Sequence, residues 1–278
     1  MKLGYNTNGT AFHRWRDALE LMAEIGYKAV AITIDHACLD PFSAQFADEL
    51  DSMRSTLQRL NLASVIETGA RFLLDSRQKH EPTLLSASAD ARRQRVDFLK
   101  RCIDIAAELN SEAVSFWSGI CRVRVSTDMA MRWLADGCRE AIDYAGEKNV
   151  KLGFEPEPGM FIETLEQFGR LTELVDAPHF GLTMDIGHIH CVEDGAIADH
   201  LREWSDRIVN VHIEDMNRGV HEHLRFGDGE IEFELVLSTL NEIGYSGCVN
   251  VELSRHCHMA PEVMRESFEF LTRSLNES

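Results

Sequence analysis

Four apolar stretches in the second half of the chain each end in a side chain that can bind a cation or carry a proton. The terminal residues are Glu155, Asp185, His212 and Glu252. If these stretches are neighbouring strands, three carboxylates meet in one place, and they repel one another unless a divalent cation lies among them. Two glutamates, an aspartate and a histidine suit Mn²⁺, Mg²⁺, Co²⁺ or Zn²⁺. We therefore predict one metal site. The plainer alternative is four solvated residues that begin polar loops.

Three histidines follow these positions closely in the sequence. His188 lies three residues after Asp185, and His221 and His223 form an H-x-H pair nine and eleven residues after His212. In extended chain, alternate residues point the same way, so such a pair can present two imidazoles to one site. We expect His188 to serve the site, and we assign the H-x-H pair to a candidate second metal. The alternative for each is ordinary polar surface.

Other regions near the predicted strand ends carry residues that could contact a substrate, and two of them are loops. About twenty residues separate the stretch ending at Glu67 from the next helical pattern, and loops of that length often cover a ligand. Arg218 precedes the glycine-containing segment 225–230, and an arginine there could hold a hydroxyl, carboxylate or phosphate group. The candidate substrate contacts are His36, Glu67, Arg71, Lys79, His80, Trp117 and Arg218. Surface ion pairs, a charged lid and, for the tryptophan, core packing are the alternatives.

Eight short apolar stretches alternate with amphipathic segments along the whole chain. The predicted strands cover residues 3–6, 29–34, 63–67, 113–117, 152–155, 180–185, 208–212 and 248–252. Because these stretches are short, continuous and bounded by turns, they are typical of strands buried on both faces. The predicted helices cover residues 15–25, 91–109, 129–147, 164–175, 232–243 and 261–271. Gly26, Gly146 and Gly244 lie where left-handed residues that end helices are expected.

This alternation predicts the fold class. Eight strand–helix units in 278 residues leave about 35 residues for each unit, which is typical of an α/β protein of the (β/α)8 TIM-barrel type. We expect one domain over residues 1–278. The alternative is an open, doubly wound sheet, but no G-x-G-x-x-G follows the first strand. In a barrel, chemistry takes place at the carboxyl ends of the strands, where the four terminal residues would meet.

Composition narrows the classes of partner and location. The chain has 28 Lys and Arg against 46 Asp and Glu, a net charge of −18, which argues against nucleic acid as a partner. No stretch is long and apolar enough to predict a membrane span. Its seven cysteines are scattered and never spaced C-x-x-C, as is typical of a reducing cytoplasm. We expect a cytoplasmic enzyme with a small-molecule substrate, and a homo-oligomer is compatible with this fold.

These residues resemble the xylose isomerase-like barrel superfamily of sugar phosphate isomerases and epimerases, which includes ketose 3-epimerases, inosose-processing enzymes and endonuclease IV. The resemblance rests on Glu155, the Asp185-x-x-His188 pair, His212, Glu252 and the G-D-G-E-I-E-F segment at 227–233. It implies that the four terminal residues bind one divalent metal, commonly Mn²⁺. It also implies that the two glutamates act as acid and base on opposite faces of a substrate carbon, and that His188 and Arg218 contact the substrate.

The chain also departs from the ketose 3-epimerase pattern. Those enzymes carry a substrate-binding glutamate six residues after the first metal ligand, whereas this chain has Phe161 there, with Glu157 and Glu163 nearby. Glu157 is therefore our candidate for that role. Endonuclease IV places an acidic residue and a histidine, two residues apart, after its ligand on strand seven, and His221 and His223 resemble that arrangement.

The predicted activity follows from the chemistry of such a site. A metal that binds a carbonyl and the adjacent hydroxyl acidifies the neighbouring C–H, while one carboxylate removes the proton, another returns it, and the metal stabilises the enediolate. We predict an isomerase or epimerase of a sugar, a sugar phosphate or a polyol-derived ketone. The alternatives are a metal-dependent lyase or dehydratase on the same site, a multi-zinc hydrolase of the endonuclease IV type, and a binding or scaffold protein.

Overall fold

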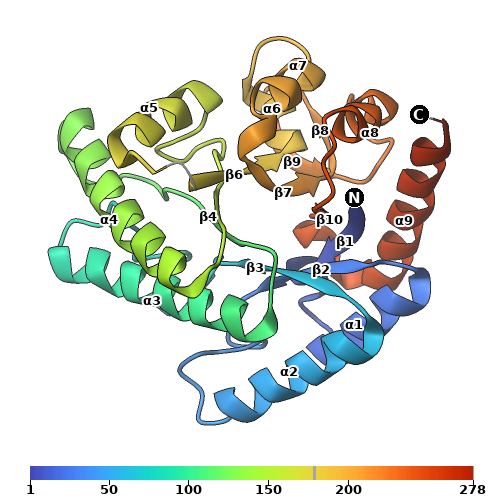
Figure 1. Ribbon diagram of the computed structural model, residues 1–278, viewed down its shortest axis with the longest axis horizontal. Helices are drawn as coiled ribbons and strands as arrows, with labels where there is room; N and C mark the ends of the chain where they lie inside the picture. The colour runs from blue at the N-terminus through green and yellow to red at the C-terminus, as the bar shows by residue number, and fades with distance from the viewer. Residues whose placement is uncertain (178–179, 278) are drawn as a thin grey trace.

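The computed structural model describes residues 1–177 and 180–277, and eight of its strands close into a parallel barrel (Figure 1). Around the barrel the strands follow the order β1-β10-β7-β6-β5-β4-β3-β2. Their bounds are β1 Lys2–Asn6, β2 Ala29–Thr33, β3 Ala63–Glu67, β4 Val114–Phe116, β5 Leu152–Phe154, β6 Phe180–Asp185, β7 Ile208–Ile213 and β10 Cys248–Val251. Each lies within one residue or so of its predicted range. The TIM-barrel prediction is confirmed.

The strands form where continuous apolar stretches can be buried on both faces. Every residue of β2 and of β6 is buried, because one face fills the barrel and the other packs under helices. Four aromatic rings pack together around β5. The ring centroid of Phe154 lies 5.3 Å from that of Phe116 in β4 and 5.7 Å from that of Phe180 in β6. Phe168 also packs against Phe180, with 5.5 Å between ring centroids. This packing fixes the strands that lead to Glu155 and Asp185.

Helices surround the barrel, and most connections from one barrel strand to the next contain a helix (Figure 1). Their bounds are α1 Trp15–Ile25, α2 Phe46–Leu60, α3 Ala89–Leu109, α4 Thr127–Lys148, α5 Leu165–Val175, α6 Ile186–Val192, α7 Ile197–Glu203, α8 Phe233–Glu242 and α9 Ala260–Glu277. Hydroxyl caps set several starts: the Ser88 side chain accepts a hydrogen bond at the start of α3, and Thr164 forms a capping box with Gln167. Among the described residues, no helix combines the length and apolar character needed to cross a lipid bilayer.

Some elements differ from the sequence-based expectation. Gly146 does not end a helix: α4 continues to Lys148 and ends at Asn149, which is left-handed with φ 56°. Gly26 and Gly244 do have the expected positive φ, at 125° and 72°. The sequence analysis did not find α2, α6, α7 or the hairpin of β8 (Asp215–Asn217) and β9 (Val220–Leu224). These elements are short or rich in polar residues, so the apolar pattern that reveals a helix or strand is weak in them.

Two glycines give a matched test of the packing. A methyl group at Gly181 in β6 would lie 2.6 Å from Val209 Cγ1 and 2.9 Å from the Leu152 carbonyl oxygen. Gly181→Ala should therefore lower the free energy of unfolding by about 1–3 kcal/mol. At the exposed helical Gly146 a methyl group meets nothing within 4 Å, so Gly146→Ala should raise that free energy by up to about 1 kcal/mol. Urea denaturation followed by circular dichroism measures both changes, and effects of the same sign would contradict this account.

Candidate active site

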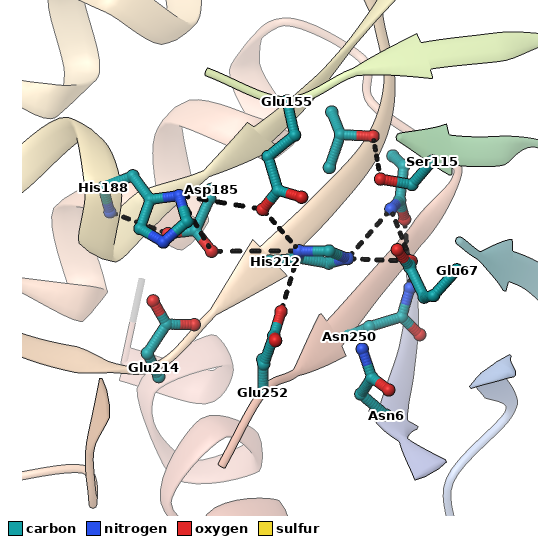
Figure 2. A network of polar contacts seen from close by, with 12 residues as sticks. Asn6, Glu67, Ser115, Glu155, Asp185, His188, His212, Glu214, Asn250 and Glu252 are labelled. Atoms are coloured by element: carbon teal, nitrogen blue, oxygen red, sulfur yellow. Dashed lines mark hydrogen bonds and ion pairs between the residues drawn. The ribbon is translucent and has the colours of Figure 1, made fainter. Parts of the chain in front are cut away.

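The four predicted metal ligands meet at the carboxyl ends of β5, β6, β7 and β10. His212 Nδ1 lies 3.0 Å from Glu155 Oε1, 3.0 Å from Glu252 Oε2 and 3.8 Å from Asp185 Oδ2. One ligand atom from each residue lies within 4.8 Å of the others. Figure 2 shows the three carboxylates grouped around one edge of the imidazole. The predicted convergence of these four side chains is therefore confirmed.

The donor set fits a divalent cation. Asp185 Oδ2 is buried and has no hydrogen-bond partner, which is costly for a carboxylate oxygen unless a cation or a proton satisfies it. Three carboxylates and one imidazole nitrogen converge, and no Lys or Arg among residues 1–177 and 180–277 is bonded to them. Oxygen and imidazole ligands of this kind suit Mn²⁺, Zn²⁺, Co²⁺ or Mg²⁺. The geometry therefore supports a divalent metal site without specifying which metal binds.

The electrostatics of the four residues are strongly asymmetric. Burial raises the pKa of the Glu155 carboxyl, although His212 opposes the shift. Burial would also raise the pKa of Glu252, but the charge and hydrogen bond of His212 outweigh it and hold that pKa well below its usual range. For His212 itself, burial lowers the pKa, and the surrounding carboxylates reverse this and raise it well above normal. In the absence of metal, protons therefore balance the charge of the site.

Hydrogen bonds from outside the set hold two of the four candidate ligands, Asp185 and Glu252, in place. Asp185 is the N-cap of α6, and its Oδ1 accepts a hydrogen bond from the His188 backbone N–H at 2.7 Å. The Asn8 side-chain amide donates to Glu252 Oε1 at 2.8 Å. Asn8 lies in the short 3-10 turn Thr7–Thr10 after β1, and the sequence analysis gave no reason to select it.

The predicted H-x-H pair joins His188 in a second cluster. His221 and His223 lie on β9, and one ring nitrogen from each of the three histidines lies within 4.8 Å of the others. His188 Nε2 and His221 Nε2 are 3.1 Å apart. Burial lowers the pKa of His188 to about 4 and also lowers that of His221. Neutral imidazoles can accept a cation or a substrate hydroxyl.

Glu214 is a buried acid that the sequence analysis missed. Its side chain is fully buried, and its Oε1 lies 3.7 Å from His223 Nδ1. Burial, together with the nearby Asp185 charge, raises its pKa well above the usual range. It connects the metal ligands with the histidine cluster. The period of two in strand β7 could have identified it, because residues 210, 212 and 214 share the inward face.

A cavity of about 390 Å³ is lined by three of the four candidate ligands, Glu155, His212 and Glu252. The predicted residues that line it are Glu67, Arg71, Lys79, His80, Trp117, Glu155, Glu157, His212, His221, His223 and Glu252. Lining residues that the sequence analysis did not select include Asn6, Asn8, Thr33, Ser115, Ser254 and Arg255. Arg71 donates to the buried Asp35 at 2.5 Å, and Trp117 packs its ring against His80 and below the Arg95 guanidinium. The long loop after β3 thus covers this side of the cavity.

Three predicted substrate contacts, His36, His188 and Arg218, lie outside the cavity lining. His188 is nevertheless close to the candidate ligands, with its Nδ1 3.7 Å from Glu155 Oε1. The His36 side chain is 75% exposed, and its Nδ1 lies 2.6 Å from Asp35 Oδ1. Arg218 lies in the turn between β8 and β9, and its guanidinium donates to the Glu193 carbonyl at 2.7 Å. The structure does not bring the His36 and Arg218 side chains to the four ligands, so their roles stay predictions.

Comparisons with known proteins give a consistent assignment of family and fold. Residues 19–274 match the family described as "xylose isomerase-like TIM barrel". The L-ribulose-5-phosphate 3-epimerase UlaE of Salmonella paratyphi A is 27% identical over 241 residues, which are 86% of this chain and 82% of the relative.

Solved structures superpose on the whole barrel. A crystal structure of IOLI protein with a bound zinc atom matches with a TM-score of 0.79 and 20% identity, covering 100% of this chain and 99% of that chain. The 3-keto-D-glucoside 4-epimerase YcjR from E. coli matches with a TM-score of 0.80 and 16% identity, covering 98% and 99%. At these identities the two structures establish the shared fold.

Metal binding at the four ligands should release protons. Without metal, the raised pKa values of His212 and Glu155 leave protons on these groups near neutral pH, and a cation must displace them. The apparent affinity for Mn²⁺ should therefore rise with pH, by about tenfold per unit for each proton displaced. Calorimetry in two buffers of different ionisation enthalpy counts the protons. Binding that releases none, with a flat pH dependence, would contradict this electrostatic account.

Proposed function

The chain belongs to the xylose isomerase-like TIM-barrel family, and from this premise we propose that it is a divalent-metal-dependent epimerase or isomerase of a sugar, sugar phosphate or polyol-derived ketone. One observation carries the proposal: Glu155 and Glu252 approach the same His212 nitrogen from opposite sides, each at 3.0 Å, at the base of an open cavity (Figure 2). A substrate carbon between two such carboxylates can lose a proton to one and regain it from the other.

The opposite pKa shifts give each glutamate a starting role. Without metal, the pKa of Glu252 is lowered and that of Glu155 is raised, so Glu252 is the natural proton acceptor. Glu155 would lose its proton when a cation binds, and, as the more easily protonated of the two, it would take up the proton that it returns to the substrate. The Asn8 amide holds Glu252 in place from the first strand. A bound cation would lower the barrier by stabilising the negative charge that develops beside the substrate carbonyl. In the reverse reaction the two glutamates exchange roles.

Mn²⁺ is the cation that we propose, with Zn²⁺, Co²⁺ and Mg²⁺ as alternatives for the same ligands. The carboxylate-rich donor set supports a hard divalent ion. Among structures of the same fold, IOLI protein holds a zinc atom. Glu155, Asp185, His212 and Glu252 would supply the ligands, and the long loop after β3 would limit the access of water.

The substrate that we propose is carbohydrate-like. L-ribulose 5-phosphate and a 3-keto-D-glucoside appear in the names of a relative and of a structural neighbour, and both are ketones flanked by hydroxyl groups. The residues proposed to contact the substrate are His188, Glu157, Arg71, Lys79, His80 and Trp117, all near the cavity. The charge of −18 supports a small molecule rather than a nucleic acid as the partner.

We further propose a single-domain, cytoplasmic enzyme. All seven cysteines are free thiols, which supports a reducing compartment. The family match over residues 19–274 supports one continuous unit.

Replacing one acid–base glutamate tests the proposed function. Glu252→Gln should lower turnover by about 10²- to 10⁴-fold, because the amide cannot accept the substrate proton. The measurement is NMR of a panel of ketoses, ketose phosphates and inososes in D₂O, which detects both epimerisation and deuterium incorporation beside the carbonyl. Glu140→Gln, on the exposed face of α4, is the matched control and should retain full activity. Undiminished deuterium incorporation by Glu252→Gln would contradict the assignment, and loss of water from the substrate would indicate the lyase alternative.

A second candidate function, a multi-zinc hydrolase, rests on the His188, His221 and His223 cluster. Elemental analysis of protein purified without chelator distinguishes the two. For an epimerase we expect about one divalent metal per chain, unchanged in a His221→Ala/His223→Ala variant, because neither histidine belongs to the four ligands. Two or more zinc equivalents, falling to one in that variant, would instead favour the hydrolase.

A further inference from the structure

Glu67 reaches across the barrel to one of the candidate metal ligands. It is the last residue of β3, it is 7% exposed, and its Oε1 lies 2.9 Å from His212 Nε2. Strands β3 and β7 are not neighbours in the barrel, so this contact passes through the interior. Figure 2 shows Glu67 on the side of the imidazole opposite the three carboxylates.

The two ring nitrogens of His212 therefore have different partners. Nδ1 faces Glu155, Asp185 and Glu252. Nε2 lies 2.9 Å from Glu67 Oε1 and 3.2 Å from Asn210 Nδ2, an amide nitrogen that itself donates to Glu67 Oε1. A neutral imidazole can bind a cation through one nitrogen only when its proton lies on the other. A carboxylate next to Nε2 accepts that proton's hydrogen bond. It therefore selects the tautomer with a free Nδ1 and fixes the orientation of the ring.

Glu67 is itself held by a chain of amides. Its Oε1 also accepts a hydrogen bond from Asn210 Nδ2 at 3.3 Å, and Asn210 Oδ1 accepts one from Asn250 Nδ2 at 3.0 Å. All three side chains are buried. The chain links β3, β7 and β10, so the carboxylate that orients His212 has little freedom to turn away. A side chain whose role was only to meet a passing substrate would not need this support.

We propose that Glu67 is a positioning residue for His212 and sets the affinity of the metal site, in place of the substrate contact expected from the sequence. This inference rests on the proposed function, because it requires a cation at Glu155, Asp185, His212 and Glu252. Residues that hydrogen-bond a ligating histidine typically change metal affinity by about 10- to 100-fold when they are removed. Substrate binding to the metal-loaded protein should change much less.

The test measures metal binding separately from activity. Metal-free protein is titrated with Mn²⁺, and the free ion is followed by electron paramagnetic resonance. Glu67→Ala should raise the Kd for Mn²⁺ by about 10- to 100-fold. Glu67→Gln keeps the side-chain volume and an acceptor oxygen, so it should lie between wild type and Glu67→Ala. With saturating Mn²⁺, the KM of both variants for the sugar should remain within about twofold of wild type.

Lys79→Ala is the matched control, because Lys79 lines the same cavity and makes no contact with His212. It should leave the Kd for Mn²⁺ unchanged. If wild type binds Mn²⁺ and both Glu67 variants bind it equally well, the inference is wrong and the proposed function stands. A raised KM with unchanged metal affinity would return Glu67 to the role of substrate contact. If wild type binds no divalent cation, the inference and the metal-dependent function fail together.

Discussion

Repulsion among buried carboxylates is the constraint on which the rest of this site depends. Glu155, Asp185, Glu214 and Glu252 lie at one end of the barrel with little access to solvent. Without a cation, the charge is balanced by the His212 imidazolium and by protons on Glu155 and Glu214, as their raised pKa values indicate. The arrangement is stable only with positive charge at its centre. A divalent cation would supply that charge and release the protons for chemistry.

The strands of the barrel fix the positions of these four side chains. Each candidate ligand lies within one residue of the end of its own strand, and the four strands are consecutive around the barrel. The register of β6 against β7 pairs Asp185 directly with His212, so two ligands are set side by side by backbone hydrogen bonds. Sites built on strands are more precisely placed than sites on loops. The longer loops then complete the wall of the cavity, with Arg71, Lys79 and His80 after β3.

Much of this was predictable from the sequence, and the exceptions have physical causes. Continuous apolar stretches revealed the strands, and the residues that end four of them predicted a candidate metal site whose side chains do converge, because parallel strands bring their ends together. Contacts across the interior, such as Glu67 with His212 or Asn8 with Glu252, join residues more than a hundred positions apart, and nothing local marks them. The sequence also does not determine which way a loop side chain turns, so His36 and Arg218 were expected to face a cavity that neither lines.

The four candidate ligands differ in the hydrogen bonds that hold them, and this difference is compatible with their proposed roles. Asp185, His212 and Glu252 are each held by a hydrogen bond from outside the set, through His188, Glu67 and Asn8. Within the described chain, the only side-chain hydrogen bond of Glu155 is with His212 Nδ1, the nitrogen that a cation would occupy. A bound cation would replace that hydrogen bond, so Glu155 would be held by the cation without support from a residue outside the set. Glu155 would thus keep freedom to turn while it transfers a proton, whereas Glu252, the other proton-transferring group, is held by Asn8. Asp185 and His212 gain by being fixed before the substrate arrives.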